Sequence, residues 1–144
     1  MKKLVKKTIL SVTALGAILS LSAFSAFAAD TPHVGNYSFY LGKGYYSVTR
    51  PGVEKVKTTS SAINNNEEIT GYNYSLRSRI LNNDEDAAVT SWVSFDEGNR
   101  ISMSYTSKVS SGSYYKMQIG PNAKETSSNI YAKGTWSPDD KNDF

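Results

Sequence analysis

Paired carboxylates are the residues of this chain whose types and spacing could do chemistry. Two carboxylates can hydrolyse a glycosidic bond when one of them lies in an apolar pocket that raises its pKa. Every cluster here falls in a predicted turn or near the C-terminus, where we expect water to surround it. A small acid-based hydrolase is therefore the least favoured interpretation, and we expect that the protein is not an enzyme. The clusters are Glu67 and Glu68, Asp84 to Asp86, Asp96 and Glu97, and Asp139 and Asp140.

Metal and thiol chemistry find little support in the sequence. The NNDED stretch at 82–86 offers clustered oxygen side chains that suit a hard cation such as Ca²⁺, but it lacks the full spacing of a calcium-binding loop. The chain has no cysteine, which excludes thiol catalysis, zinc–thiolate sites and disulfides. The one histidine, His33, is expected to be a solvated residue near a mobile terminus. We therefore expect no cofactor.

Aromatic and arginine side chains on the polar faces of predicted strands are the candidate binding residues. Alternation places Trp92 on the same face as serine and threonine residues of its strand. Aromatic residues that share an exposed sheet face can stack on a sugar ring or anchor a protein interface. The alternative is that the second sheet, a loop or the tail covers them, and for Trp92 both interpretations remain open. The candidates are Trp92, Tyr40, Tyr114, Arg77 and Arg79.

The first 28 residues have the order of a secretory signal peptide. A lysine-rich start precedes an uncharged apolar stretch, and Ala26-Phe27-Ala28 matches a signal-peptidase site. The alternative is an uncleaved membrane anchor, because residues 8–29 carry no charge. We expect cleavage after Ala28 and a secreted protein, extracellular or associated with the cell wall. No second apolar stretch follows, so the mature form is not expected to span a membrane.

The signal peptide also accounts for the basic charge of the chain. The whole sequence has 16 Lys and Arg against 13 Asp and Glu, a net charge of +3. Four of the lysines and no acid lie in residues 1–28, so 12 basic residues oppose 13 acidic ones in the remainder. A concentrated cationic face is not expected from this balance, and we expect no binding to nucleic acid.

Short alternating runs rich in Tyr, Val, Ile, Ser and Thr predict an all-β protein. We expect an antiparallel β-sandwich or barrel-like fold of about seven strands over residues 37–137. Residues 29–36 are expected to be a flexible segment, and residues 138–144 a polar C-terminal tail. Alternation also assigns Tyr46, Tyr74 and Trp136 to the core. The predicted strands are 36–41, 45–50, 72–81, 87–95, 100–109, 113–119 and 129–136.

Turn residues predict how these strands connect. Glycines in 42–44, 96–99 and 111–113 favour three hairpins, because glycine tolerates the positive φ that tight turns need. Residues 51–71 contain a proline and the run Asn64 to Asn66, which we expect to break regular structure. This segment is therefore predicted to be a long loop, with at most one short strand within it.

The stretches NYSF, SWVSF, NRISMSY, SGSYYKMQIGPNAK and YAKGTWSPD, in this order, resemble a family of small secreted proteins of Gram-positive bacteria classed as a domain of unknown function. The resemblance covers the signal peptide and nearly all of the remaining chain. It implies a secreted all-β protein and carries no known active residues. Some exported proteins of similar size and β-rich composition are bacteriocins, which suggests an envelope-directed role by analogy.

Export, near-neutral charge and an excess of tyrosine together predict a function in binding. We expect a secreted, non-enzymatic protein that recognises a cell-envelope component or a protein partner, in one version as a bacteriocin-like protein. An extracellular carbohydrate-binding module is the alternative. The sequence does not specify the ligand or the oligomeric state.

Overall fold

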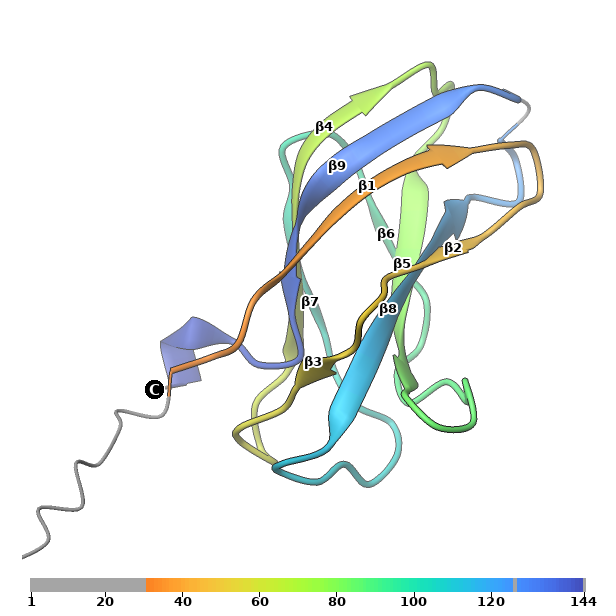
Figure 1. Cartoon of the computed structure of the whole chain (residues 1–144). Coiled ribbons are helices and arrows are strands. Elements are labelled where there is room, and N and C mark those ends of the chain that lie inside the picture. The colour runs from red at the N-terminus through yellow and green to blue at the C-terminus, as the bar shows by residue number, and fades with distance from the viewer. Residues whose placement is uncertain (1–30, 126, 144) are drawn as a thin grey trace, which may run out of the picture.

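The computed structural model describes residues 31–125 and 127–143. The predicted signal peptide, residues 1–28, lies outside them. The described chain forms two antiparallel sheets that face each other as a sandwich (Figure 1). The all-β sandwich expected from the alternating runs is confirmed. None of the described residues form a helix long and apolar enough to cross a membrane.

The first sheet has four strands in the order β1–β9–β4–β7. Strand β9 pairs with β1 on one side and with β4 on the other, and β4 pairs in turn with β7. The strands are β1 (Gly35–Leu41), β4 (Ala62–Thr70), β7 (Arg100–Met103) and β9 (Ile130–Ser137). A short 3-10 helix, η1 (Lys141–Asp143), follows β9.

The second sheet has five strands and is centred on β8. One side of β8 pairs with β5, which also pairs with β6, and the other side pairs with both β2 and β3. The strands are β2 (Ser47–Val48), β3 (Val53–Glu54), β5 (Leu76–Asn82), β6 (Val93–Phe95) and β8 (Tyr114–Pro121).

The predicted hairpins are wrong, although the glycines adopt the predicted backbone. Gly44, Gly98 and Gly112 have φ angles of 75°, 72° and 77°. The strands on either side of each turn nevertheless belong to different sheets, so each turn carries the chain across the sandwich. A glycine specifies the conformation of a turn, whereas the partner of a strand is decided by distant residues.

The predicted long loop at 51–71 is wrong in its second half, which forms the nine-residue strand β4, whereas β3 is the one short strand that the prediction allowed. Asn64 and Asn66 point into the sandwich and are buried. The Tyr37 hydroxyl donates a hydrogen bond of 2.9 Å to Asn64 Oδ1 and accepts one of 3.2 Å from Asn66 Nδ2. Asn64 Nδ2 also donates to Ser78 Oγ of the opposite sheet, at 3.2 Å. Burial raises the pKa of Tyr37 to about 12. The asparagine side chains can thus occupy the core because Tyr37, Ser78 and backbone carbonyls satisfy their hydrogen bonds.

An apolar core fills the space between the sheets. Trp136 belongs to it as predicted, with 1% of its surface exposed. Tyr46 and Tyr74 do not, because β2 and β5 begin later than expected and leave both residues exposed in the preceding loops. The largest apolar side chains that are fully buried include Leu76, Ile80, Phe95, Met103, Met117, Ile119 and Ile130.

An ion pair between Lys55 and Asp139 is completely buried at one end of the sandwich. Lys55 Nζ lies 2.9 Å from Asp139 Oδ1, and neither side chain is exposed. The same ammonium donates to the carbonyls of Ser60 and Pro138, both at 2.7 Å. Burial lowers the pKa of Lys55, and the hydrogen bond to Asp139 opposes this shift. All three donors of the ammonium therefore have acceptors.

The C-terminal residues after β9 are held in place by this pair. We expected Asp139 to be a solvated residue of a polar tail, but its carboxylate accepts hydrogen bonds from the backbone N–H groups of Val56 and Lys57. The hydroxyl of Tyr105 donates to the carbonyl of Pro138 at 2.8 Å, and its ring lies 4.4 Å from Lys55 Nζ. The start of the predicted tail is thus part of the packed domain.

Removing one partner of the buried pair should strongly destabilise the protein. Lys55→Met is expected to lower the free energy of unfolding by about 3–5 kcal/mol, because it leaves the Asp139 carboxylate buried without its counterion. Lys55→Met combined with Asp139→Asn removes both charges and should lose less than the two single variants together. Urea denaturation measures these values. The exposed Lys108→Met is the control, and a loss below about 1 kcal/mol in Lys55→Met would mean that the pair acts like a surface ion pair.

The asparagine network predicts a second stability difference. Tyr37→Phe is expected to lower the free energy of unfolding by about 1–3 kcal/mol, because it removes the donor to Asn64 and the acceptor for Asn66. Tyr40→Phe removes a hydroxyl from a side chain that is 79% exposed and should leave stability unchanged. Equal denaturation midpoints for the two variants would show that the network contributes little.

Candidate binding surface on the five-stranded sheet

The outer face of the five-stranded sheet gathers the arginine and tryptophan candidates. The alternate residues of β5 that point into the sandwich are buried, so Arg77 and Arg79 point outward. The register places Arg79 opposite Gln118 of β8. Trp92, one residue before β6, packs against both arginines. Together with Tyr46, these side chains form what we call the arginine–tryptophan face: Tyr46, Arg77, Arg79, Trp92 and Gln118.

Trp92 is covered by the side chains of Arg77 and Arg79 and by Tyr46 from the segment before β2. The centroid of its ring lies 4.7 Å from the guanidinium carbon of Arg77 and 4.5 Å from that of Arg79. The ring of Tyr46 lies 5.4 Å away, tilted by 31°. Trp92 is therefore half-buried, and it supports the two arginines instead of offering an open aromatic platform.

Hydrogen bonds hold the arginines in place. Arg77 donates from NH2 to the Tyr46 hydroxyl at 2.7 Å, and Arg79 donates from Nε to Gln118 Oε1 at 2.7 Å. Gly120 makes room for Tyr46, because a Cβ at that position would lie 2.0 Å from Cδ1 of the tyrosine ring. Sequence reasoning missed Tyr46 as a site residue. A glycine inside the strand pattern was the available signal, since it often marks a close approach of another group.

The charge of this face is not neutralised locally. Among the residues that the structure describes, no carboxylate forms an ion pair with Arg77 or Arg79. Further along the face, Lys116 Nζ lies 2.6 Å from Asp86 Oδ1, and this hydrogen bond holds the pKa of Asp86 below its usual value. Arg50 adds a smaller contribution in the same direction. The arginine–tryptophan face is therefore positive and preorganised, and it can bind and orient an anion.

The structure does not bring all five candidates together. Tyr114 is exposed on the same outer face, but it lies four residues from Gln118 along β8, a separation of about 13 Å. Tyr40 lies on the other sheet, in β1, where its ring is 5.1 Å from that of Tyr131. The single platform of Trp92, Tyr40 and Tyr114 considered from the sequence is therefore not formed.

Exposed tyrosines extend the surface into the loops beside the arginine–tryptophan face. Tyr45 and Tyr46 precede β2, and Tyr74 precedes β5, with exposures of 75%, 45% and 49%. The buried carboxylate of Glu125 shapes this end, because it accepts hydrogen bonds from the backbone N–H groups of Asn73 and Tyr74. The loop that presents Tyr74 is thus fixed by a residue 51 positions away.

The residues considered for catalysis do not form a reactive constellation. His33 is exposed and lies 3.7 Å from Glu54. The two buried carboxylates of the described chain, Glu125 and Asp139, accept hydrogen bonds from backbone N–H groups and thus serve the fold. Within residues 31–125 and 127–143, no cluster of acidic, histidine or cysteine side chains could hold a metal ion. The segment 82–86 instead closes as a turn around Asn82 Oδ1, so the geometry does not support the calcium alternative.

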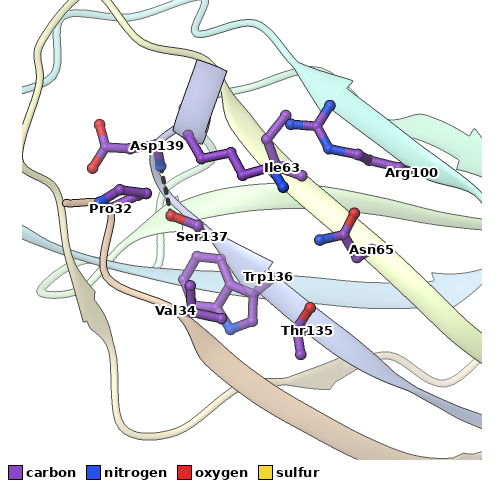
Figure 2. A pocket seen from close by; sticks show the side chains of 10 residues that line it. Pro32, Val34, Ile63, Asn65, Arg100, Thr135, Trp136, Ser137 and Asp139 are labelled. Atoms are coloured by element: carbon purple, nitrogen blue, oxygen red, sulfur yellow. Dashed lines mark hydrogen bonds between the residues drawn. The ribbon is translucent and has the colours of Figure 1, made fainter. Parts of the chain in front are cut away.

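A small hollow lies where the first described residues meet the C-terminal end (Figure 2). Pro32 and Val34 line it together with Trp136 and Asp139. Its volume of about 60 Å³ is far below the roughly 300–1,000 Å³ of ordinary small-molecule sites. We assign no ligand to this hollow.

Comparison with protein-family models, with curated proteins and with solved structures finds no match for this chain.

Fluorescence quenching tests the positive charge of this face. The chain has two tryptophans, and Trp136 is buried, so collisional quenchers reach mainly Trp92. The ratio of iodide quenching to caesium quenching is expected to be higher than for free N-acetyltryptophanamide, because the neighbouring guanidiniums raise the local concentration of anions. Arg79→Gln should reduce this preference. Trp92→Phe is the control and should leave a weakly quenched signal, whereas an iodide-to-caesium ratio equal to that of N-acetyltryptophanamide would contradict a positive face.

Proposed function

We propose that this is a secreted, non-enzymatic protein that recognises a cell-envelope component through the arginine–tryptophan face. The observation that carries the proposal is the pair Arg77 and Arg79, which are held against Trp92 and lack a carboxylate partner in the described chain. Two cations on a protein surface without counterions favour the approach of an anionic ligand.

Preorganisation supports a role in recognition. Long arginine side chains lose rotamer freedom when they bind a ligand, and this loss weakens binding. Here the aromatic rings and the acceptors on Tyr46 and Gln118 already restrict Arg77 and Arg79. The exposed tyrosines beside them add the amphipathic contact area that is common at binding surfaces.

An extracellular site of action follows from the sequence pattern of the first 28 residues. The resemblance to small secreted proteins of Gram-positive bacteria supports the same location, at the cell wall or in the medium. A bacteriocin-like role is the version of this proposal in which binding to the envelope kills the cell.

Carbohydrate binding is the second candidate, and one observation favours it. Tyr40 is 79% exposed on the outer face of the four-stranded sheet, next to the ring of Tyr131. Exposed aromatic rings on a sheet can stack on sugars. This pair lies on the opposite side of the sandwich from the arginine–tryptophan face, so variants can separate the two functions.

Co-sedimentation with washed Gram-positive cell walls tests the proposal. The parent protein should sediment with the walls, and Trp92→Ala should weaken binding about tenfold or more, which corresponds to about 1.4 kcal/mol. The physical reason is that Trp92 holds both guanidiniums in position. Tyr40→Ala is the matched control, because it removes an exposed aromatic ring from the other sheet.

The other outcomes are equally informative. Binding that survives Trp92→Ala and is lost in Tyr40→Ala would support the carbohydrate-binding alternative. A parent protein that stays in solution would contradict an envelope target and favour a soluble protein partner. Viable counts of intact cells in parallel tubes decide the bacteriocin-like version, which requires that bound cells die.

A further inference from the structure

We infer that the arginine–tryptophan face binds a phosphodiester polymer of the cell envelope, of the glycerol-phosphate type. The inference rests on the proposed function and specifies the chemistry of the ligand. It depends on three features of the face: its unpaired guanidiniums, their spacing, and the occupied faces of its aromatic rings.

The unpaired charge is confined to one part of the sheet. Asp86 is bonded to Lys116, and Glu54 lies 3.7 Å from His33, so the carboxylates that share this outer face already have neighbouring cationic or titratable groups. Arg77 and Arg79 have only neutral partners, a tyrosine hydroxyl and an amide oxygen. An anion that reaches this part of the sheet therefore meets positive charge without displacing a protein carboxylate.

The donors that remain on the arginines suit phosphate oxygens. Arg79 donates its hydrogen bond to Gln118 from Nε. No described residue accepts a hydrogen bond from its two terminal nitrogens. A guanidinium with free terminal N–H groups can bind two oxygens of one phosphate in a planar fork. The contact with Trp92, in which the guanidinium carbon of Arg79 lies 4.5 Å from the ring centroid, leaves these donors free of protein acceptors.

The spacing of the arginines suits an anionic polymer with a short repeat. Two residues with one between them on a strand lie roughly 6.5 Å apart along the chain direction. The guanidinium carbons of Arg77 and Arg79 lie 4.7 Å and 4.5 Å from the centroid of the same Trp92 ring, so they are no more than about 9 Å apart, and neighbouring charges of an anion with a short repeat can reach both.

The aromatic rings argue against nucleic acid as the polymer. Proteins that bind single-stranded nucleic acid use open aromatic faces on which bases stack. The Trp92 ring is already in contact with Arg77, Arg79 and Tyr46. A flexible phosphodiester chain without bases needs only the guanidinium donors, and so it fits the face as the structure presents it.

The experiment compares the binding of the purified protein to two wall preparations. One preparation is intact, and the other has lost its phosphodiester-linked polymers by acid treatment. We expect binding to fall at least tenfold on the stripped walls, and soluble poly(glycerol phosphate) should compete for the protein. Binding should also weaken as salt increases, because the contact is ionic.

Charge variants locate the contact. Arg77→Gln with Arg79→Gln should reduce binding to intact walls at least tenfold and make its salt dependence shallower. Lys133→Gln is the matched control, because it removes one cation from the outer face of the other sheet. Thermal denaturation of each variant shows whether it is folded, and the comparison of the two wall preparations needs no variant.

The outcomes separate the two levels of the proposal. Equal binding to intact and stripped walls would overturn the phosphodiester inference and leave envelope recognition in place. No binding to either preparation would overturn both. A single-stranded oligonucleotide that competes as well as poly(glycerol phosphate) at the same phosphate concentration would overturn the choice of a base-free polymer.

Discussion

The buried pair of Lys55 and Asp139 is the interaction on which the rest of the sandwich depends. The chain has no cysteine for crosslinks, and most of its strands pair with strands distant in sequence. Lys55 follows β3 of one sheet and Asp139 follows β9 of the other, so the pair joins the two sheets at one end. Buried charges are tolerated only where their hydrogen bonds are complete. Because backbone groups of both segments complete them, the pair favours a single arrangement of the two sheets.

A second polar contact links the core to the arginine–tryptophan face. Asn64 of β4 donates across the sandwich to Ser78 of β5. Ser78 lies between Arg77 and Arg79 in the strand, and a shift of register by one residue would turn both arginines into the core. The inward hydrogen bond therefore helps to fix the outward direction of the arginines. The fold positions its candidate site through buried polar groups as well as through apolar packing.

Alternation in the sequence predicted much of the fold but not its pairings. Strands β1, β8 and β9 and the turn glycines follow from local pattern, because their residues prefer these conformations on their own. Strand β4 could not be predicted in this way, since Asn64 and Asn66 disfavour strands until distant partners bury them. At the surface, alternation gave the outward position of Trp92. Alternation wrongly places its neighbour Tyr46 in the core, since the contact of Tyr46 with Gly120 forms only between segments distant in sequence.

Net charge was a poor guide to the charge of this surface. A near-neutral balance beyond residue 28 argues against a cationic face. Several of the described acids, however, are buried or paired with cations elsewhere in the structure. Asp139 and Glu125 are buried as acceptors for the fold, and Asp86, Glu67 and Asp140 each pair with a cation outside the arginine–tryptophan face. Acids that are committed to internal contacts cannot screen Arg77 and Arg79. The local potential of a small sheet is therefore determined by which charges are paired, and a count over the whole chain does not contain that information.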